Sequence, residues 1–365
     1  MSLPANRSKV RGDHLLQPWE EFWVIHRPFL LERGYKLRNR YDANWIPSWY
    51  DKKAKIVYCS DSLSAPAQQI LDAVRVSDGK KVILKVVDIN KDIPILDYLN
   101  SPALLADERN HTVPILDKFP VPHEEHLTWI VMPFLLMFHA FIHPFQYVSE
   151  IIEPVTQFLE GLELMHEHGI AHRDACFFNL MVDSTKLVPD GNVSFLDSSR
   201  TEDWSRLLTP VERRSVAPLK YYFIDFETAI RFSPDTKNPR CVGRFGQEHE
   251  APELSETIPY NPFKLDVYQL GMIFPPLFEV YDGMEFLVPL HEAMTRANPD
   301  ERPTAAEANV MFKSMISLFT EADMLKRIWD KRTPLKHRRR IENPKPRRTL
   351  RTQISRIFRV VKIQS

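Results

Sequence analysis

Residues 172–179 carry the sequence HRDACFFN, directly after a long amphipathic segment. This stretch places a carboxylate, Asp174, five residues before a carboxamide, Asn179. Phosphoryl transfer needs that combination, because a carboxylate orients the attacking hydroxyl and accepts its proton, and an amide oxygen helps to hold a metal on the phosphates. His, Arg and Asp also occur together in surface loops by chance, so the sequence that follows decides between the two interpretations.

Four further motifs follow in a fixed order: DFE after the apolar run 221–224, APE at 251–253, Asp266 in DVYQLG, and Arg302 in NPDERPT. Each motif alone is a weak signal. The ordered set resembles the eukaryotic protein kinase superfamily, with its HRD, DFG and APE elements. The aromatic N-terminal segment also looks like the extension that precedes the kinase domain in a divergent fungal branch of kinase-like proteins.

The resemblance implies an α+β chain with a two-lobed protein-kinase-like fold, in which a small β-rich N-lobe precedes a larger, mainly α C-lobe. We expect an aromatic extension at 1–50, the N-lobe at 51–135, the C-lobe at 136–325 with an insertion at about 188–218, and a flexible basic tail at 326–365. A length of 365 residues also favours two lobes or a domain with tails.

The composition is that of an ordinary globular protein. No run of 18 or more apolar residues occurs and the N-terminus lacks a signal-peptide core, so we expect an intracellular protein, cytoplasmic or nuclear. The three cysteines lack metal-ligand spacing, which predicts no disulfide partners.

The net charge of zero hides an asymmetry. Residues 331–365 carry 13 Lys or Arg against one Glu, a local net charge of +12, so the rest of the chain carries −12. A solvated tail is the favoured interpretation. Contact with acidic partners, an acidic membrane surface or nucleic acid, and nuclear import, are weaker alternatives. The apolar residues at 354–361 would suit a short amphipathic helix, which keeps membrane association as a minor hypothesis.

Apolar runs at 70–76 and 81–87 flank a turn, Ser-Asp-Gly-Lys, and predict strand, turn, strand. The second strand resembles the kinase strand whose lysine holds the α- and β-phosphates of ATP, which makes Lys85 the candidate. Without the downstream motifs, a lysine that reaches solvent would be the better interpretation. A helix glutamate fixes this lysine in the resembling family, but residues 91–99 contain no Glu. Asp92 aligns best, although its side chain is one methylene shorter.

Residues 110–116 match the loop and strand that follow that helix. Residues 129–135 predict a strand and a connector, and their place in the motif order makes Pro133, Phe134 and Leu135 the expected hinge beside adenine. A plain buried strand and linker is the alternative.

The expected glycine-rich phosphate loop is missing, because residues 51–69 contain no glycine. Hydroxyls of Ser60, Ser62 and Ser64 are possible substitutes, but a serine-rich surface loop is the favoured interpretation. The tryptophans of the first 50 residues predict an ordered extension that packs onto the main domain rather than a binding surface.

Residues 148–168 predict a helix that Gly169 ends, since apolar residues recur at helical spacing. The strands expected around the central loop are 180–182 and 221–224. Further helices are expected at 263–279, 287–296 and 305–319.

The resemblance implies four functional residues and two cofactors, ATP and Mg²⁺. Asp174 matches the catalytic base, Asn179 and Asp225 match the metal ligands, and Lys85 matches the phosphate-binding lysine. Structural roles fall on five more residues. His172 packs beneath the loop, Arg173 couples the loop to the activation segment, Asp266 anchors the loop backbone, and Glu253 forms a buried ion pair with Arg302.

Two residues depart from the pattern. Cys176 stands where Ser/Thr-specific kinases carry a lysine that contacts the γ-phosphate, and as a nucleophile it lacks an activating base. Glu227 replaces the glycine that normally follows Asp-Phe, so it restricts the backbone and adds an anion beside the metal site. That anion would ligate a cation or repel ATP, and the sequence does not choose between these.

Three functions follow from these observations. The first is a protein kinase that transfers the ATP γ-phosphate to a hydroxyl of an unknown protein substrate, Ser or Thr rather than Tyr. The second is a pseudokinase, a binding or scaffolding module, which the missing glycine loop, the missing helix glutamate, Cys176 and Glu227 favour. The third is a small-molecule kinase, which the APE triplet and Arg302 disfavour because they imply a protein-substrate platform.

Overall fold

The computed structural model describes residues 16–51, 55–65, 67–139, 144–189, 191, 193–209 and 211–342. The predicted amphipathic helix at 354–361, most of the basic tail, the first 15 residues of the extension, and Asp190 and Asn192 of the insertion lie outside these ranges. The described chain is α+β. Within it, no helix combines the length and the apolar content that crossing a bilayer requires.

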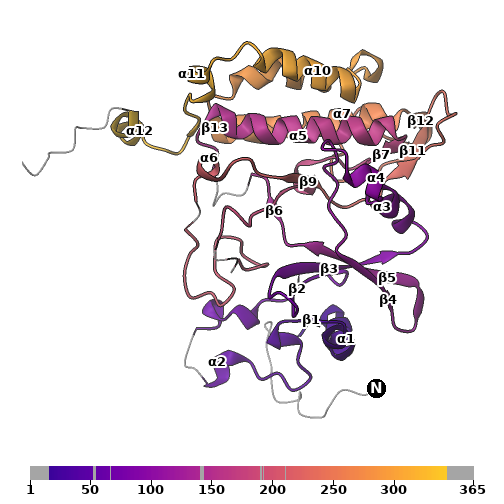
Figure 1. The fold of residues 1–365 in the computed structure, drawn as a ribbon, viewed down its shortest axis with the longest axis vertical. Helices are drawn as coiled ribbons and strands as arrows, with labels where there is room; N and C mark the ends of the chain where they lie inside the picture. Colours follow the sequence, from indigo (N-terminus) through magenta and orange to yellow (C-terminus); the bar gives the residue numbers. More distant parts are fainter. Residues whose placement is uncertain are drawn as a thin grey trace, which may run out of the picture.

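A five-stranded antiparallel sheet forms one end of the molecule, with the strand order β1-β2-β3-β5-β4 (Figure 1). The strands are β1 (Tyr35–Lys36), β2 (Ile70–Arg75), β3 (Lys81–Asp88), β4 (Asp117–Val121) and β5 (Glu124–Pro133). The predicted strand, turn, strand is confirmed as β2 and β3. Gly79 supports the turn with φ +70°, a conformation that only glycine adopts at low cost. The register places Lys85 between Ile70 and Ile130.

The N-terminal extension packs on one face of this sheet, as predicted from its aromatic residues. Helix α1 (Glu21–Glu32) inserts Trp23 and Leu30, both fully buried, into a cluster that includes Leu84 of β3 and Trp129 of β5. Strand β1 also lies within the predicted extension, so the sheet begins before residue 50. Burial of this much aromatic surface is the main stabilising contribution to this face.

Helices gather at the opposite end of the molecule around α5 (Val148–Glu167). Gly169 follows it with φ +71° and ends the helix, as predicted. Apart from α1 and α5, the helices of eight or more residues in the described part of the chain are α7 (Pro262–Gly271), α10 (Ala305–Ile316) and α12 (Leu335–Glu342). The shorter ones are α2 (Ser48–Asp51), α3 (Ile93–Leu99), α4 (Pro102–Leu105), α6 (Arg213–Val216), α8 (Phe274–Val280), α9 (Val288–Met294) and α11 (Glu321–Met324).

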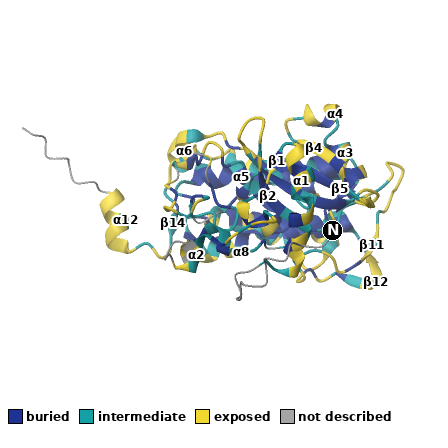
Figure 2. Ribbon diagram, turned by 90° about the horizontal axis from the view of Figure 1, so that it is seen from below, coloured by how far each residue is buried: buried dark blue, intermediate teal, exposed yellow. Residues whose placement is uncertain are grey.

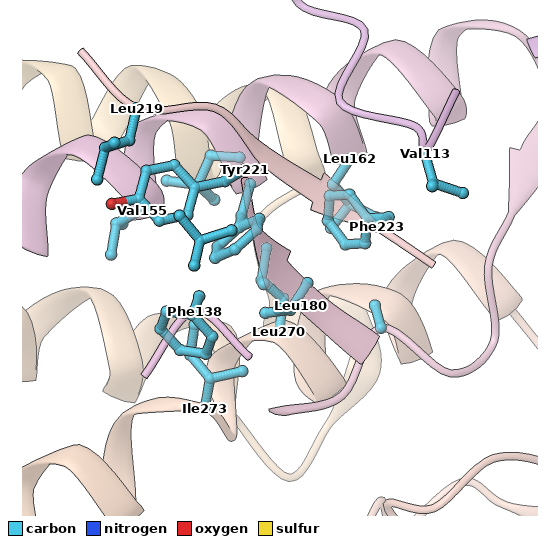
Figure 3. Packing of buried hydrophobic residues seen from close by; sticks show 14 of the residues in the cluster. Val113, Phe138, Val155, Leu162, Leu180, Leu219, Tyr221, Phe223, Leu270 and Ile273 are labelled. Carbon is cyan, nitrogen blue, oxygen red and sulfur yellow. The ribbon is translucent and has the colours of Figure 1, made fainter. Parts of the chain in front are cut away.

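A small sheet of β6 (Leu136–Met137), β8 (Leu180–Val182) and β9 (Tyr221–Phe223) lies between the large sheet and the helices. Leu180, Tyr221 and Phe223 of this sheet, and Phe138 directly after β6, pack with Leu162 of α5 and with Ile273, which follows α7 (Figure 3). Three two-stranded ladders complete the strands, β7 (Ile170–Ala171) with β10 (Ile230–Arg231), β11 (Cys241–Gly243) with β12 (Ser255–Tyr260), and β13 (Tyr281–Asp282) with β14 (Trp329–Asp330).

Three predictions about helices, strands and the tail need correction. The strand predicted within 110–116 starts only at Asp117, because Pro114 lacks an N–H and Ile115 donates its N–H to Asn100 instead of a strand. The helix predicted at 263–279 is two helices, α7 and α8, with Pro275 and Pro276 in the first turn of the second, where proline is tolerated.

The third correction concerns the predicted flexible tail. Residues 335–342 form helix α12, an exposed helix that projects from the body (Figures 1 and 2). Arg338 holds it in place, since its guanidinium donates to the Asp282 carboxylate at 2.6 Å and to the backbone oxygen of Asp330 at 3.0 Å.

Candidate functional site

The loop at 172–179 rests on helix α7 through Asp266. One carboxylate oxygen of Asp266 accepts the N–H of His172 at 2.8 Å, and the other accepts the N–H of Arg173 at 2.6 Å. Asp266 is fully buried. Arg173 has φ +62°, an uncommon backbone conformation for a non-glycine residue, and these two bonds hold it there.

Gln269 is a second anchor that the sequence analysis missed. Its side-chain oxygen accepts the N–H of Ala175 at 3.1 Å, and its nitrogen donates to the carbonyl of Arg173 at 3.0 Å. Gln269 lies three residues after Asp266, so both side chains share one face of α7. This three-residue spacing is the feature of the sequence from which the role of Gln269 could have been predicted.

His172 is buried beneath the loop, as the resemblance implied. Its Nε2 donates to the carbonyl of Ile224 at 3.0 Å, and its Nδ1 accepts the N–H of Asp174 at 3.3 Å. Burial lowers the pKa of His172, which favours this neutral form. The ring also lies 4.7 Å from the ring of Phe226, so the histidine connects the loop to the segment that carries Asp225.

Asp174 and Asn179 lie side by side, as the five-residue spacing suggested. The Asn179 amide nitrogen donates to the carboxylate and to the backbone oxygen of Asp174, both at 2.9 Å. The second carboxylate oxygen of Asp174 accepts the N–H of Gln247 at 2.8 Å. The N–H of Ile224 donates to the Asn179 carbonyl, which brings Asp225 next to this pair.

Gly246 allows the chain to approach Asp174 this closely. Its φ is +87°, and a Cβ there would lie 2.7 Å from the Arg173 carbonyl oxygen and 2.8 Å from the Asp174 carboxylate. Only glycine fits without displacing one of these groups. Gly246 and Gln247 are therefore part of the site, although the sequence analysis gave neither an individual role.

Lys85 lies between two carboxylates. Its Nζ is 2.9 Å from Asp225 and 2.7 Å from Glu227. Burial alone would lower the pKa of Lys85, but the two carboxylates outweigh it and raise that pKa. Burial alone would likewise raise the pKa of Asp225, but Lys85 lowers it. Asp225 has φ +64°, so two of the predicted site residues, Arg173 and Asp225, have a left-handed backbone.

Asp92 is near this group and forms no ion pair with Lys85 among the described residues. Instead one of its carboxylate oxygens accepts the N–H of Asp88 at 3.0 Å, just before α3 begins. Burial, followed by the nearby Glu227, raises the pKa of Asp92. Asp92 aligned best with the helix glutamate of the resembling family, but it does not form the corresponding ion pair with Lys85.

The expected hinge residues follow β5. Pro133 ends β5 opposite Val82, and Phe134 and Leu135 are half-buried. The Phe134 ring lies 5.1 Å from the ammonium of Lys81 on β3. That ammonium also donates to the Val193 carbonyl at 2.6 Å and pairs with Glu202, so the insertion is attached to the sheet beside the expected hinge.

The segment at 37–65, of which residues 37–51 and 55–65 are described, stands where the glycine-rich loop was expected, between β1 and β2. The buried guanidinium of Arg40 donates to both carboxylate oxygens of Glu20, at 2.9 and 2.7 Å, and to the Asp61 carbonyl at 2.8 Å. The N–H of Ala65 donates to the same Glu20 at 3.0 Å.

This segment, β2 and the insertion line a cavity of about 740 Å³ whose wall includes Arg38, Ser60 and Lys81. Ser62 is buried, so the prediction of a serine-rich surface loop is wrong for that residue.

Arg173 contacts the segment that follows Asp225. Its Nε donates to the Thr228 carbonyl at 2.6 Å, the Thr228 hydroxyl donates to the His172 carbonyl, and the guanidinium lies 4.4 Å from the Phe245 ring. Further along, the buried guanidinium of Arg302 donates to both carboxylate oxygens of Glu253, at 2.5 and 2.9 Å.

Cys176 is buried beside Asp174. Burial, followed by the charge of Asp174, raises the pKa of its thiol to about 12. A thiol is nucleophilic as the thiolate, so this environment opposes the minor alternative of Cys176 as a nucleophile.

The described residues contain no cluster of three or more His, Cys, Asp or Glu side chains suited to a metal ion. Comparison of the chain with protein-family models and with curated proteins finds no match. The geometry of the site is therefore the basis for its function.

Proposed function

We propose that this protein is a protein kinase with the two-lobed kinase fold, which transfers the γ-phosphate of ATP to a protein hydroxyl, Ser or Thr rather than Tyr. The five-stranded sheet with α3 corresponds to the N-lobe of this proposal, and the helices around α5 correspond to the C-lobe. The nucleotide would lie between them, near Lys85 and the connector at 133–135.

One observation carries the proposal. Asp174 and Asn179 form one hydrogen-bonded pair, and Lys85 and Asp225 form another, while the Asn179 carbonyl and the N–H of Ile224 join the two pairs. These residues come from β3, the loop after α5 and the segment after β9. Their convergence provides a carboxylate for the attacking hydroxyl and a cation for the phosphates.

Asp174 would orient the substrate hydroxyl. Its two carboxylate oxygens are fixed by Gln247 and Asn179, so the carboxylate is already oriented before a substrate binds. As the hydroxyl oxygen bonds to the γ-phosphorus, the bond from that phosphorus to the bridging oxygen of ADP breaks, and the hydroxyl proton passes to Asp174.

The residues present fit a Mg²⁺ ion that binds together with the nucleotide. Mg²⁺ in such sites takes one or two protein carboxylates and completes its shell with phosphate oxygens and water, so a dedicated cluster of acidic residues is not required. The partly exposed carboxylate of Asp225 and the amide oxygen of Asn179 would hold it. When bound, the ion neutralises charge on the phosphates.

A binding module without turnover is the second candidate. The segment at 37–65 favours it, because its sequence contains no glycine and the buried Glu20–Arg40 pair holds its described residues, whereas a flexible glycine-rich backbone usually supplies the N–H groups that surround the phosphates. Loss of turnover is the difference between the two candidates, so an experiment on Asp174 separates them.

The test is transfer of labelled γ-phosphate from ATP to a protein and peptide mixture, with wild type and Asp174→Asn. We expect the variant to lose about 10²- to 10⁴-fold in rate and to keep its fold, because asparagine has nearly the same shape. Asp183→Asn is the matched control, since Asp183 accepts the N–H of Thr185 at an exposed turn after β8. Equal rates in wild type and Asp174→Asn, or transfer only to small molecules, would contradict the proposal.

A further inference from the structure

Two carboxylates share one ammonium at Lys85, although a single carboxylate neutralises a lysine. The Lys85 side chain is only 12% exposed, and both partners come from the same three-residue segment after β9, Asp225 at 2.9 Å and Glu227 at 2.7 Å. A buried ammonium without a partner is costly, so at least one carboxylate must stay beside it in every state of the protein.

Helix α3, which flanks Lys85, offers no carboxylate for this purpose. Its one acidic residue, Asp97, pairs with Lys118 at 2.6 Å on the outer surface. Asp92 precedes the helix and lines a small cavity together with Lys85 and Glu227, but its bonded oxygen accepts the N–H of Asp88. Among the described residues, its other oxygen accepts no hydrogen bond.

The proposed function, on which this inference rests, gives the two carboxylates at Lys85 different roles. Asp225 is the residue that would turn toward the metal and the phosphates when the nucleotide binds, and it then weakens its contact with Lys85. Among the described residues, Glu227 has no ionic partner other than Lys85, and its side chain is nearly half exposed, so it can stay on Lys85 while Asp225 turns.

We infer that Glu227 is the positioning residue for Lys85, holding its ammonium toward the nucleotide phosphates in the place of a carboxylate from helix α3. Glutamate where the resembling family carries glycine after Asp-Phe, and the lack of an acidic partner for Lys85 on α3, then have a single explanation.

The backbone explains how Glu227 reaches Lys85. Asp225 has φ +64°, and the next residue, Phe226, is buried with its ring 4.7 Å from that of His172. These two features fix the direction in which the chain leaves Asp225, and Glu227 then faces β3. The metal ligand and the residue that positions the lysine are thus on one segment. A shift of α3 alone leaves Lys85 in place. A shift of residues 225–227, in contrast, displaces the metal ligand Asp225 and also frees the Lys85 ammonium from Glu227.

The first experiment compares affinities for Mg-ATP and for adenosine, by calorimetry, in wild type, Glu227→Gln and Asp97→Asn. Glu227→Gln should weaken Mg-ATP binding about tenfold, the effect expected for one charged contact to the phosphates, and leave adenosine binding unchanged. Asp97→Asn breaks the ion pair on the outer side of α3 and should change neither affinity.

The second experiment shows whether Glu227 acts through Lys85. In a Lys85→Met background, Glu227→Gln should change neither the Mg-ATP affinity nor the midpoint of urea unfolding any further. A further loss as large as that in wild type would mean that Glu227 acts on the nucleotide or on the fold directly, and would overturn the inference. Because the urea midpoint needs no nucleotide, this measurement does not depend on turnover.

The outcomes separate the inference from the proposed function. Wild type that does not bind Mg-ATP would overturn both. If wild type binds Mg-ATP and Glu227→Gln binds it equally well, the positioning role alone is overturned. The same conclusion follows if Glu227→Gln binds Mg-ATP more tightly because a repelling anion is gone. Tenfold weaker Mg-ATP binding with unchanged adenosine binding supports it.

Discussion

The loop at 172–179 and the described residues of the segment at 37–65 are both held by buried polar contacts, and they differ in the groups that make these contacts. The loop is fixed by Asp266, Gln269 and the N–H of Gln247, which bond to its own backbone or to Asp174. The described residues of the segment are fixed by the buried ion pair of Glu20 with Arg40, by the ion pair of Arg38 with Asp72, and by side chains packed on the sheet.

The difference shows which parts of such a site tolerate change. The contacts that hold the loop fall on the backbone of residues 172–175 and on the side chains of Asp174 and Asn179, which carry the proposed chemistry, so few substitutions are compatible with it. The segment only has to cover β1 and β2 and satisfy its own polar groups. A glycine-rich turn and a packed segment with a buried arginine both meet that requirement.

The largest expected effect is on stability, and it tests whether a buried ion pair holds the segment as firmly as the Glu253–Arg302 pair holds the helical end. Glu20→Gln removes the carboxylate that the buried Arg40 guanidinium contacts, and Glu253→Gln removes the one that Arg302 contacts. Each should lower the free energy of unfolding by about 3–5 kcal/mol, measured by urea denaturation. Asp97→Asn, which breaks an exposed pair, should cost less than about 1 kcal/mol. A similarly small loss for Glu20→Gln would mean that the ion pair does not hold the segment.

The Glu20–Arg40 pair also predicts a pH dependence. Burial alone would raise the pKa of Glu20, but hydrogen bonds from Arg40 and from the backbone outweigh it, and the folded-state pKa is lowered. The stability that this pair contributes is therefore present above the unfolded-state pKa and is lost as the pH falls through the folded-state value. Wild type should lose more stability between pH 7 and acid pH than Glu20→Gln does, and parallel pH profiles would contradict this.

An intermediate loss of stability is expected when alanine replaces either of two glycines that have similar φ angles. Gly246 has φ +87° and Gly34 has φ +88°, but a Cβ on Gly34 meets nothing within 4 Å, whereas one on Gly246 would collide with Arg173 and Asp174. Gly34→Ala should cost about 1–2 kcal/mol for the backbone conformation alone. Gly246→Ala should cost about 1–3 kcal/mol more and reduce phosphate transfer, because it displaces the Gln247 N–H from Asp174. Equal losses of stability and unchanged transfer would show that this contact is unimportant.

The smallest effect concerns the thiol in the loop. With a pKa of about 12, Cys176 should stay unmodified by iodoacetamide at pH 8 in the native protein, while the half-exposed Cys241 reacts. Modification of Cys176 should rise only as the pH approaches 12 or the protein unfolds. Mass spectrometry of the labelled peptides measures this, and rapid native labelling of Cys176 at pH 8 would contradict the buried position of the thiol.

The sequence predicted the elements with strong local patterns. Apolar spacing and Gly169 predicted α5, and the Ser-Asp-Gly-Lys turn predicted β2 and β3. The placement of Asp174 beside Asn179 followed from their spacing in one loop.

Contacts between distant residues were not predictable in the same way. Arg40 and Glu20 are separated by 20 residues without a motif, and the contact of Glu227 with Lys85 depends on the direction of the chain after Asp225. Helix α12 was missed because its charged sequence has no apolar face, and Arg338 anchors it through Asp282.

Nucleotide binding is the central claim, and a thermal-shift titration with ATP, with and without Mg²⁺, tests it most directly on wild type and Asp225→Ala. A ligand at 100 times its dissociation constant stabilises the fold by about 2.7 kcal/mol, which visibly raises the melting temperature. The account predicts a Mg²⁺-dependent rise in wild type that is lost in Asp225→Ala. No rise in wild type at any attainable ATP concentration would contradict it.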